Sequence, residues 1–116
     1  MDENLLKRYI EIGLTENFDD LRALFLESEV EKQGEIMRQT FQYWYDIAAP
    51  LKDDEIAALI KTFAIAEKIL PGWNAGSVSP VIWLGIKLSQ RKYFEIDKLR
   101  SWVKIHSNND WLTKRW

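Results

Sequence analysis

The chain has 116 residues, of which 47% are hydrophobic and 13% aromatic, with a formal net charge of −2 and no cysteine. This length is enough for one domain with its own core, and the composition excludes a disordered chain. The absence of cysteine excludes disulfides and thiolate metal ligands, and it fits a reducing compartment. The sequence shows neither a signal peptide nor an apolar run long enough for a membrane span. We therefore expect a single cytoplasmic domain over residues 1–116.

Charge is divided unequally along the chain. Residues 1–70 contain 8 Lys and Arg against 15 Asp and Glu, whereas residues 71–116 contain 8 against 3. The first part is therefore strongly acidic and the second part basic. Three interpretations stay open: attraction between the two parts within the fold, an acidic surface for a basic protein, or a basic surface for a nucleic acid.

Two short helices are expected at the start of the chain. Apolar residues at helical spacing predict a helix over residues 3–12, which Gly13 would end. A second amphipathic helix is predicted over residues 18–27, with Asp19 and Asp20 placed favourably for the helix dipole. The expected inward side chains of this second helix are Phe18, Leu21, Leu24 and Phe25.

A longer third helix is predicted over residues 28–48. Its start matches the capping-box pattern Ser28-x-x-Glu31, and Pro50 stops it. Side chains three or four residues apart share one face of a helix, which gives this segment an apolar stripe. The expected core residues of the stripe are Met37, Phe41, Trp44 and Ala48.

The helices predicted over residues 53–70 and 80–90 are expected to form the central pair. Asp53 is expected to cap the first, and Ser79 the second, which has proline in its first position. Gly85 costs about 1 kcal/mol relative to alanine inside a helix. We therefore expect a neighbouring helix to approach closely there.

A sixth helix is predicted over residues 95–107, with His106 on its apolar face as a structural residue. The tail over residues 108–116 ends in tryptophan and is expected to pack back on the bundle. No strand-like alternation is present, and the signature of the tetratricopeptide repeat is absent. The sequence thus predicts an all-α fold, a compact, irregular, orthogonal bundle of about six helices.

The densest turn chemistry lies in residues 71–80, between the two central helices. Glycines, hydroxyls and a helix N-terminus present donors that can bind an anion, although no nucleotide-binding fingerprint is present. The alternative is a plain connection in which a tryptophan fills the top of the core. The candidate anion-binding residues are Trp73, Asn74, Gly76, Ser77 and Ser79.

No group of residues predicts catalysis. The chain has one histidine, so the carboxylate runs cannot combine with two histidines in a metal site, and they do not have the spacing of an EF-hand. No cofactor cradle is present. We therefore expect a non-enzymatic protein without metal or cofactor.

The favoured function is a protein-interaction module, such as a regulator, an adaptor or a small inhibitor of the immunity-protein type. The acidic first part would attract a basic protein partner, and aromatic anchors would supply affinity. The candidate partner-binding residues are Glu27, Glu31, Glu35, Tyr43, Tyr45 and Asp46.

Two alternatives remain. A nucleic acid could bind the basic second part, where cations follow one another at helical spacing, although they could equally be an exposed stripe. The residues of this alternative are Trp83, Lys87, Arg91, Arg100 and Lys104. The other alternative is a homodimer in which the acidic surface of one copy meets the basic surface of another.

Overall fold

Six α-helices and four short 3₁₀ segments make up the computed structural model, which describes all residues 1–116 and contains no strand. The elements are α1 (Glu3–Thr15), η1 (Phe18–Ala23), η2 (Glu27–Glu29), α2 (Val30–Gln33), η3 (Gly34–Arg38), α3 (Phe41–Ala48), α4 (Asp53–Ile69), η4 (Gly76–Val78), α5 (Pro80–Gln90) and α6 (Ile96–His106). The predicted all-α helical bundle is confirmed. No helix combines the length and the apolar character that crossing a membrane requires.

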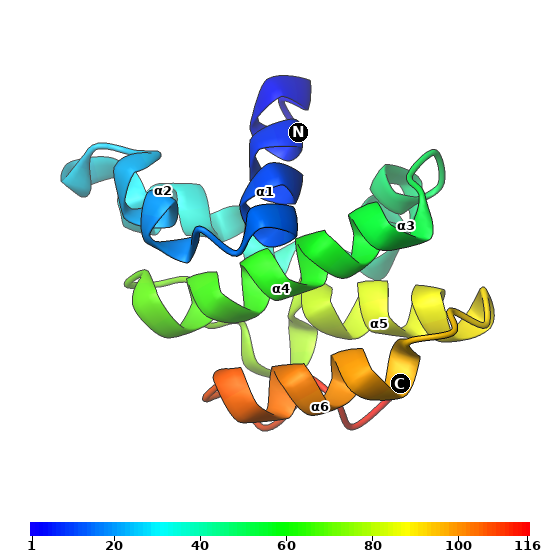
Figure 1. Cartoon of the computed structure of the whole chain (residues 1–116). Helices are drawn as coiled ribbons and strands as arrows, with labels where there is room; N and C mark the ends of the chain where they lie inside the picture. The colour runs from blue at the N-terminus through cyan, green and yellow to red at the C-terminus, as the bar shows by residue number, and fades with distance from the viewer.

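α4 lies at the centre of the bundle, where it packs against α1, α5 and α6. In Figure 1, α1 stands across α4, and α5 and α6 follow below it in successive layers. From Ile56 to Glu67 every residue of α4 is buried except Lys61. The predicted central pair therefore corresponds to α4 and α5, and α1 joins them through its extensive contact with α4.

α1 and α4 approach each other closely because a glycine lies at their crossing. A Cβ atom at Gly13 would lie 2.0 Å from the carbonyl oxygen of Ala58. α1 continues through this glycine to Thr15, so the prediction that Gly13 ends the helix is wrong. The buried hydroxyl of Thr62 donates to the main-chain oxygen of Tyr9 at 2.6 Å, which ties the two helices together.

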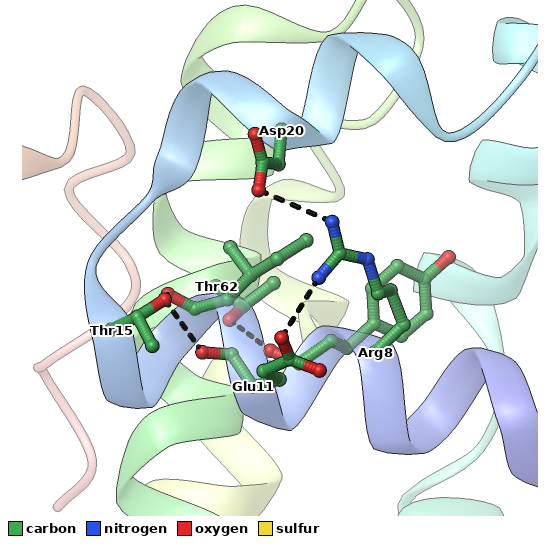
Figure 2. A network of polar contacts seen from close by, with 7 residues as sticks. Arg8, Glu11, Thr15, Asp20 and Thr62 are labelled. Atoms are coloured by element: carbon green, nitrogen blue, oxygen red, sulfur yellow. Dashed lines mark hydrogen bonds and ion pairs between the residues drawn. The ribbon is translucent and has the colours of Figure 1, made fainter.

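The chain after α1 turns back along it through η1. The guanidinium of Arg8 donates to the carboxylates of Glu11 and Asp20, both at 3.2 Å, as Figure 2 shows. η1 is a 3₁₀ segment that ends at Ala23, so the α-helix predicted over residues 18–27 is wrong. The side chains predicted to face inward are buried or half-buried: Phe18, Leu21, Leu24 and Phe25.

The single helix predicted over residues 28–48 is interrupted at Gly34. A Cβ atom at Gly34 would lie 2.8 Å from the indole of Trp73, which arrives there from the far end of α4. The same indole nitrogen donates to the carbonyl oxygen of Val30 at 2.8 Å. Ser28 makes no capping hydrogen bond, and only η2, α2 and η3 form in this stretch.

α3 starts afresh after an extended residue. Thr40 has extended backbone, and its hydroxyl accepts a hydrogen bond from the N–H of Tyr43 at 3.2 Å. The new start leaves Trp44 and Ala48 fully buried, as expected, but Phe41 is 51% exposed. The prediction that Phe41 faces the core is wrong because the helix containing it does not continue from residue 28.

Of the caps predicted for the two central helices, one is wrong and one is confirmed. Lys52 precedes the first turn of α4, and its N–H donates to the carboxylate of Glu55 at 2.9 Å. Asp53 lies inside the helix, so the prediction that it is the cap is wrong. The hydroxyl of Ser79 accepts from the N–H of Val81 at 3.1 Å, which confirms the predicted cap of α5.

The tail over residues 108–116 lies against α5. Leu112 and Trp116 are buried, and a Cβ atom at Gly85 would lie 2.2 Å from the ring of Trp116. The close approach predicted at Gly85 is therefore real, but the tail makes it and not a neighbouring helix. Arg100 of α6 donates to the main-chain oxygen of Trp116, which secures the end of the chain.

Candidate functional site

The loop over residues 71–80 binds a carboxylate of the protein itself. Glu67, near the end of α4, is 4% exposed. Its carboxylate accepts hydrogen bonds from the N–H of Ala75 at 2.8 Å, the hydroxyl of Ser79 at 3.0 Å and the side-chain amide of Asn109 at 3.2 Å. These donors come from the loop, the start of α5 and the tail, so Glu67 joins three segments to α4.

The other candidate residues of this loop have structural partners. Trp73 is fully buried, and the side-chain oxygen of Asn74 accepts from the N–H of Gly76 at 3.0 Å. Arg38 donates to the carbonyl oxygens of Gly72 and Asn74, both at 3.1 Å. Ser77 is exposed, and no hydrogen bond of its side chain is present. Of the donors that the sequence offered to an external anion, the indole of Trp73, the N–H of Gly76 and the hydroxyl of Ser79 are thus used within the fold, whereas Ser77 is not.

Burial decides the ionisation of Glu67. It raises the pKa of this carboxyl to about 6, while the three hydrogen bonds and the nearby Arg38 lower it. The carboxylate is therefore fixed by three hydrogen bonds but poorly solvated.

An ordered group of aromatic side chains lies on the surface where α3 meets α5. The ring of Phe41 packs edge-to-face against Tyr45 at 5.6 Å and against Trp83 at 6.1 Å between centroids. The indole nitrogen of Trp83 donates to the carbonyl oxygen of Val78 at 3.2 Å. Such contacts fix the ring orientations, while Phe41 and Val78 stay 51% and 44% exposed.

Two cations lie over these rings. The ammonium of Lys87 is 4.9 Å from the centroid of Tyr45, and the guanidinium of Arg115 is 5.3 Å from that of Trp83. Neither side chain takes part in any ion pair of the protein. The aromatic–cation patch consists of Phe41, Tyr45, Trp83, Lys87 and Arg115.

The structure separates the predicted partner-binding residues into two groups. Tyr45 belongs to the patch, Asp46 beside it accepts from Gln42 at 2.8 Å, and Tyr43 is half-buried against Trp44. The second group, Glu27, Glu31 and Glu35, lies in an exposed run of carboxylates over η2, α2 and η3 that also contains Glu29. These four residues are here called the acidic segment. In Figure 1, α2 and α3 lie on opposite sides of α1.

Both arginines of the predicted nucleic-acid-binding set are hydrogen-bonded within the protein. Arg91 donates to the carbonyl oxygen of Leu51 at 2.8 Å and to the carboxylate of Asp53 at 3.1 Å. Arg100 donates to Asp97 at 2.7 Å in addition to the end of the tail. Of the other predicted residues, Lys104 is exposed on α6, and the remaining two belong to the patch. The expected rows of free cations are therefore not formed.

A cleft of about 230 Å³ separates α1 and α6 above α4. Lys61 lies over the ring of Trp102 at 5.1 Å and pairs with Glu16 at 3.8 Å, while Lys98 pairs with Glu95 at 3.5 Å. Both lysines at its walls are thus paired, whereas Asp54, which also lines the cleft, takes part in no ion pair.

His106 has a structural environment. Its ring stacks on Trp102 at 4.1 Å, and its Nδ1 lies 2.8 Å from the carbonyl oxygen of Trp102. No three His, Asp or Glu side chains gather in a way that would hold a metal ion.

Comparison with known proteins adds no relative: no protein-family model, curated protein or solved structure matches the chain.

Sequence reasoning missed two members of the patch, Phe41 and Arg115. The spacing of Phe41 and Tyr45 by four residues was visible, and it would have indicated a surface pair if Thr40 had been taken as the start of the helix. No local signal marks Arg115, because the fold of the tail alone brings it to Trp83.

Proposed function

We propose that the protein is a non-enzymatic protein-interaction module, acting as a regulator, an adaptor or a small inhibitor, and that it binds a protein partner through the aromatic–cation patch. The observation that carries the proposal is the half-exposed ring of Phe41, fixed edge-to-face between Tyr45 and Trp83. Rings that are already ordered lose little conformational entropy on binding, and aromatic side chains dominate the energetics of interfaces.

The acidic segment supports the same proposal at longer range. Its four carboxylates are exposed and have no cationic partner within the protein. Such a surface speeds the encounter with a basic region of a partner, while the aromatic rings supply affinity. The partner is therefore expected to be a protein with a basic region that faces the acidic segment, separate from the surface that covers the patch.

Nucleic-acid binding is the second candidate, and the cations over Tyr45 and Trp83 are the observation that favours it. Binding along a phosphate backbone needs several free cations in a row. Because Arg91 and Arg100 are hydrogen-bonded within the fold, the patch offers only Lys87 and Arg115. The protein partner remains the better-supported proposal.

Affinity capture from a nuclease-treated native lysate tests the proposal, with the tagged wild type, Phe41→Ala and Phe94→Ala as baits. Phe94 is 86% exposed and lies outside the patch, so it is a matched control for the loss of an exposed phenyl ring. We expect a stoichiometric protein with the wild type and Phe94→Ala, and about tenfold less of it with Phe41→Ala. Equal capture by all three baits, or capture abolished by nuclease, would contradict the proposal.

A further inference from the structure

The two charged surfaces of the chain are complementary, and both are unpaired. The ion pairs of the protein involve neither the four carboxylates of the acidic segment nor the two cations of the aromatic–cation patch. Only the pair between Arg91 and Asp53, at 3.1 Å, joins the basic part of the chain to the acidic part. The opposite charges of the two parts are therefore left largely free for contacts outside the molecule.

Their apolar features are complementary as well. Leu26 directly precedes the acidic segment and is 69% exposed, so it presents apolar surface beside the carboxylates. The patch presents the half-exposed ring of Phe41 beside Tyr45 and Trp83, with a cation over each of the latter two rings, so it can cover an aliphatic side chain flanked by carboxylates. Desolvation of leucine by aromatic rings would add affinity to the charge contacts.

We propose that this chain associates with a second copy of itself through contact of the aromatic–cation patch of one copy with Leu26 and the acidic segment of the other. Both halves of the contact are present on one molecule, and neither has an ion-pair partner within it. α2 and α3 lie on opposite sides of α1 (Figure 1), and no ion pair joins the two surfaces within one molecule. The contact therefore forms between molecules.

Self-association would regulate the proposed function, because it covers the patch on which the foreign partner is expected to bind. The two proposals share this surface but are tested separately. Self-association concerns the purified protein alone, and its failure would leave the binding of a foreign partner unaffected.

Sedimentation velocity of the purified full chain tests the inference with two neutralised variants. The patch variant combines Lys87→Gln and Arg115→Gln. The segment variant combines Glu27→Gln, Glu29→Gln, Glu31→Gln and Glu35→Gln. We expect the wild type to associate at low salt, with an association constant about tenfold lower at high salt, where screening is stronger. Each variant alone should be monomeric.

An equimolar mixture of the two variants is the decisive sample. The patch variant retains an intact acidic segment and the segment variant an intact patch, so the mixture can form one native contact and should contain two-copy complexes. A control variant with Lys92→Gln and Lys104→Gln, which removes two exposed cations outside the patch, should associate like the wild type. A monomeric wild type at low salt, or a mixture that stays monomeric, would overturn the inference.

Discussion

At the scale of single residues, Glu67 is a buried carboxylate that joins the loop, the start of α5 and the tail to α4. Three hydrogen bonds favour its charged form, but burial outweighs them and raises the pKa of the carboxyl from 4.5 to about 6. The folded state therefore binds this proton more tightly than the unfolded state does. It follows that ionisation of Glu67 lowers the free energy of unfolding relative to the protonated form, in spite of the three hydrogen bonds.

This sign gives a testable pH dependence. The contribution of Glu67 to stability is fully present below pH 4.5 and is lost as the pH rises through about 6. For a pKa that rises from 4.5 to about 6, the loss amounts to about 2 kcal/mol. Glu67→Gln keeps the shape and one acceptor without the charge. From pH 4.5 to pH 7.5, urea unfolding should show the stability difference moving by about 2 kcal/mol in favour of Glu67→Gln. A pH-independent difference would contradict the prediction.

Residue-scale features were predictable where their cause is local. Ser79 caps α5 because its hydroxyl lies two residues from the N–H that it accepts. The close approach at Gly85 was also predictable, because glycine inside a helix costs stability unless a neighbouring group occupies the space of its missing side chain. The group that approaches was not, because Trp116 is distant in the sequence and only the fold of the tail brings it there.

At the scale of elements, the best-predicted helices have an apolar pattern that continues without interruption. α4, α5 and α6 lie within one or two residues of their predicted ranges. The segment over residues 28–48 also has a helical pattern, but Trp73 packs against Gly34 and breaks it. Local periodicity cannot encode this contact, because the tryptophan belongs to the loop after α4. Two cap motifs compete in this segment, and the structure uses Thr40 and not Ser28.

Single substitutions at the two competing caps distinguish a broken helix from a continuous one. Thr40→Ala removes the hydroxyl that accepts from Tyr43 and should lower the free energy of unfolding by about 1 kcal/mol. Ser28→Ala removes no hydrogen bond and should change it by less than about 0.5 kcal/mol. Urea unfolding of both variants measures the two values. A larger cost for Ser28→Ala than for Thr40→Ala would instead support a continuous helix from residue 28.

At the scale of the whole molecule, the sequence identified the division of charge but not which charges are free. Lys87, in the last turn of α5, and Arg91, directly after the helix, lie four residues apart. Lys87 lies over Tyr45, whereas Arg91 donates to the carbonyl oxygen of Leu51. The acidic segment was predicted as a surface because runs of carboxylates are rarely buried. Its separation from Tyr45 could not be predicted, since it depends on how α2 and α3 are placed around α1.

The charge division should therefore affect association more than stability. Most ion pairs lie within one part of the chain, and several are largely exposed, where each contributes little. Raising the NaCl concentration from about 20 mM to about 500 mM should change the free energy of unfolding by less than about 1 kcal/mol. Urea unfolding at low protein concentration, where association does not add to stability, measures this change. A loss of several kcal/mol at high salt would show instead that the acidic and basic parts stabilise the fold by attracting each other, and the charges assigned to intermolecular contact would be serving the fold.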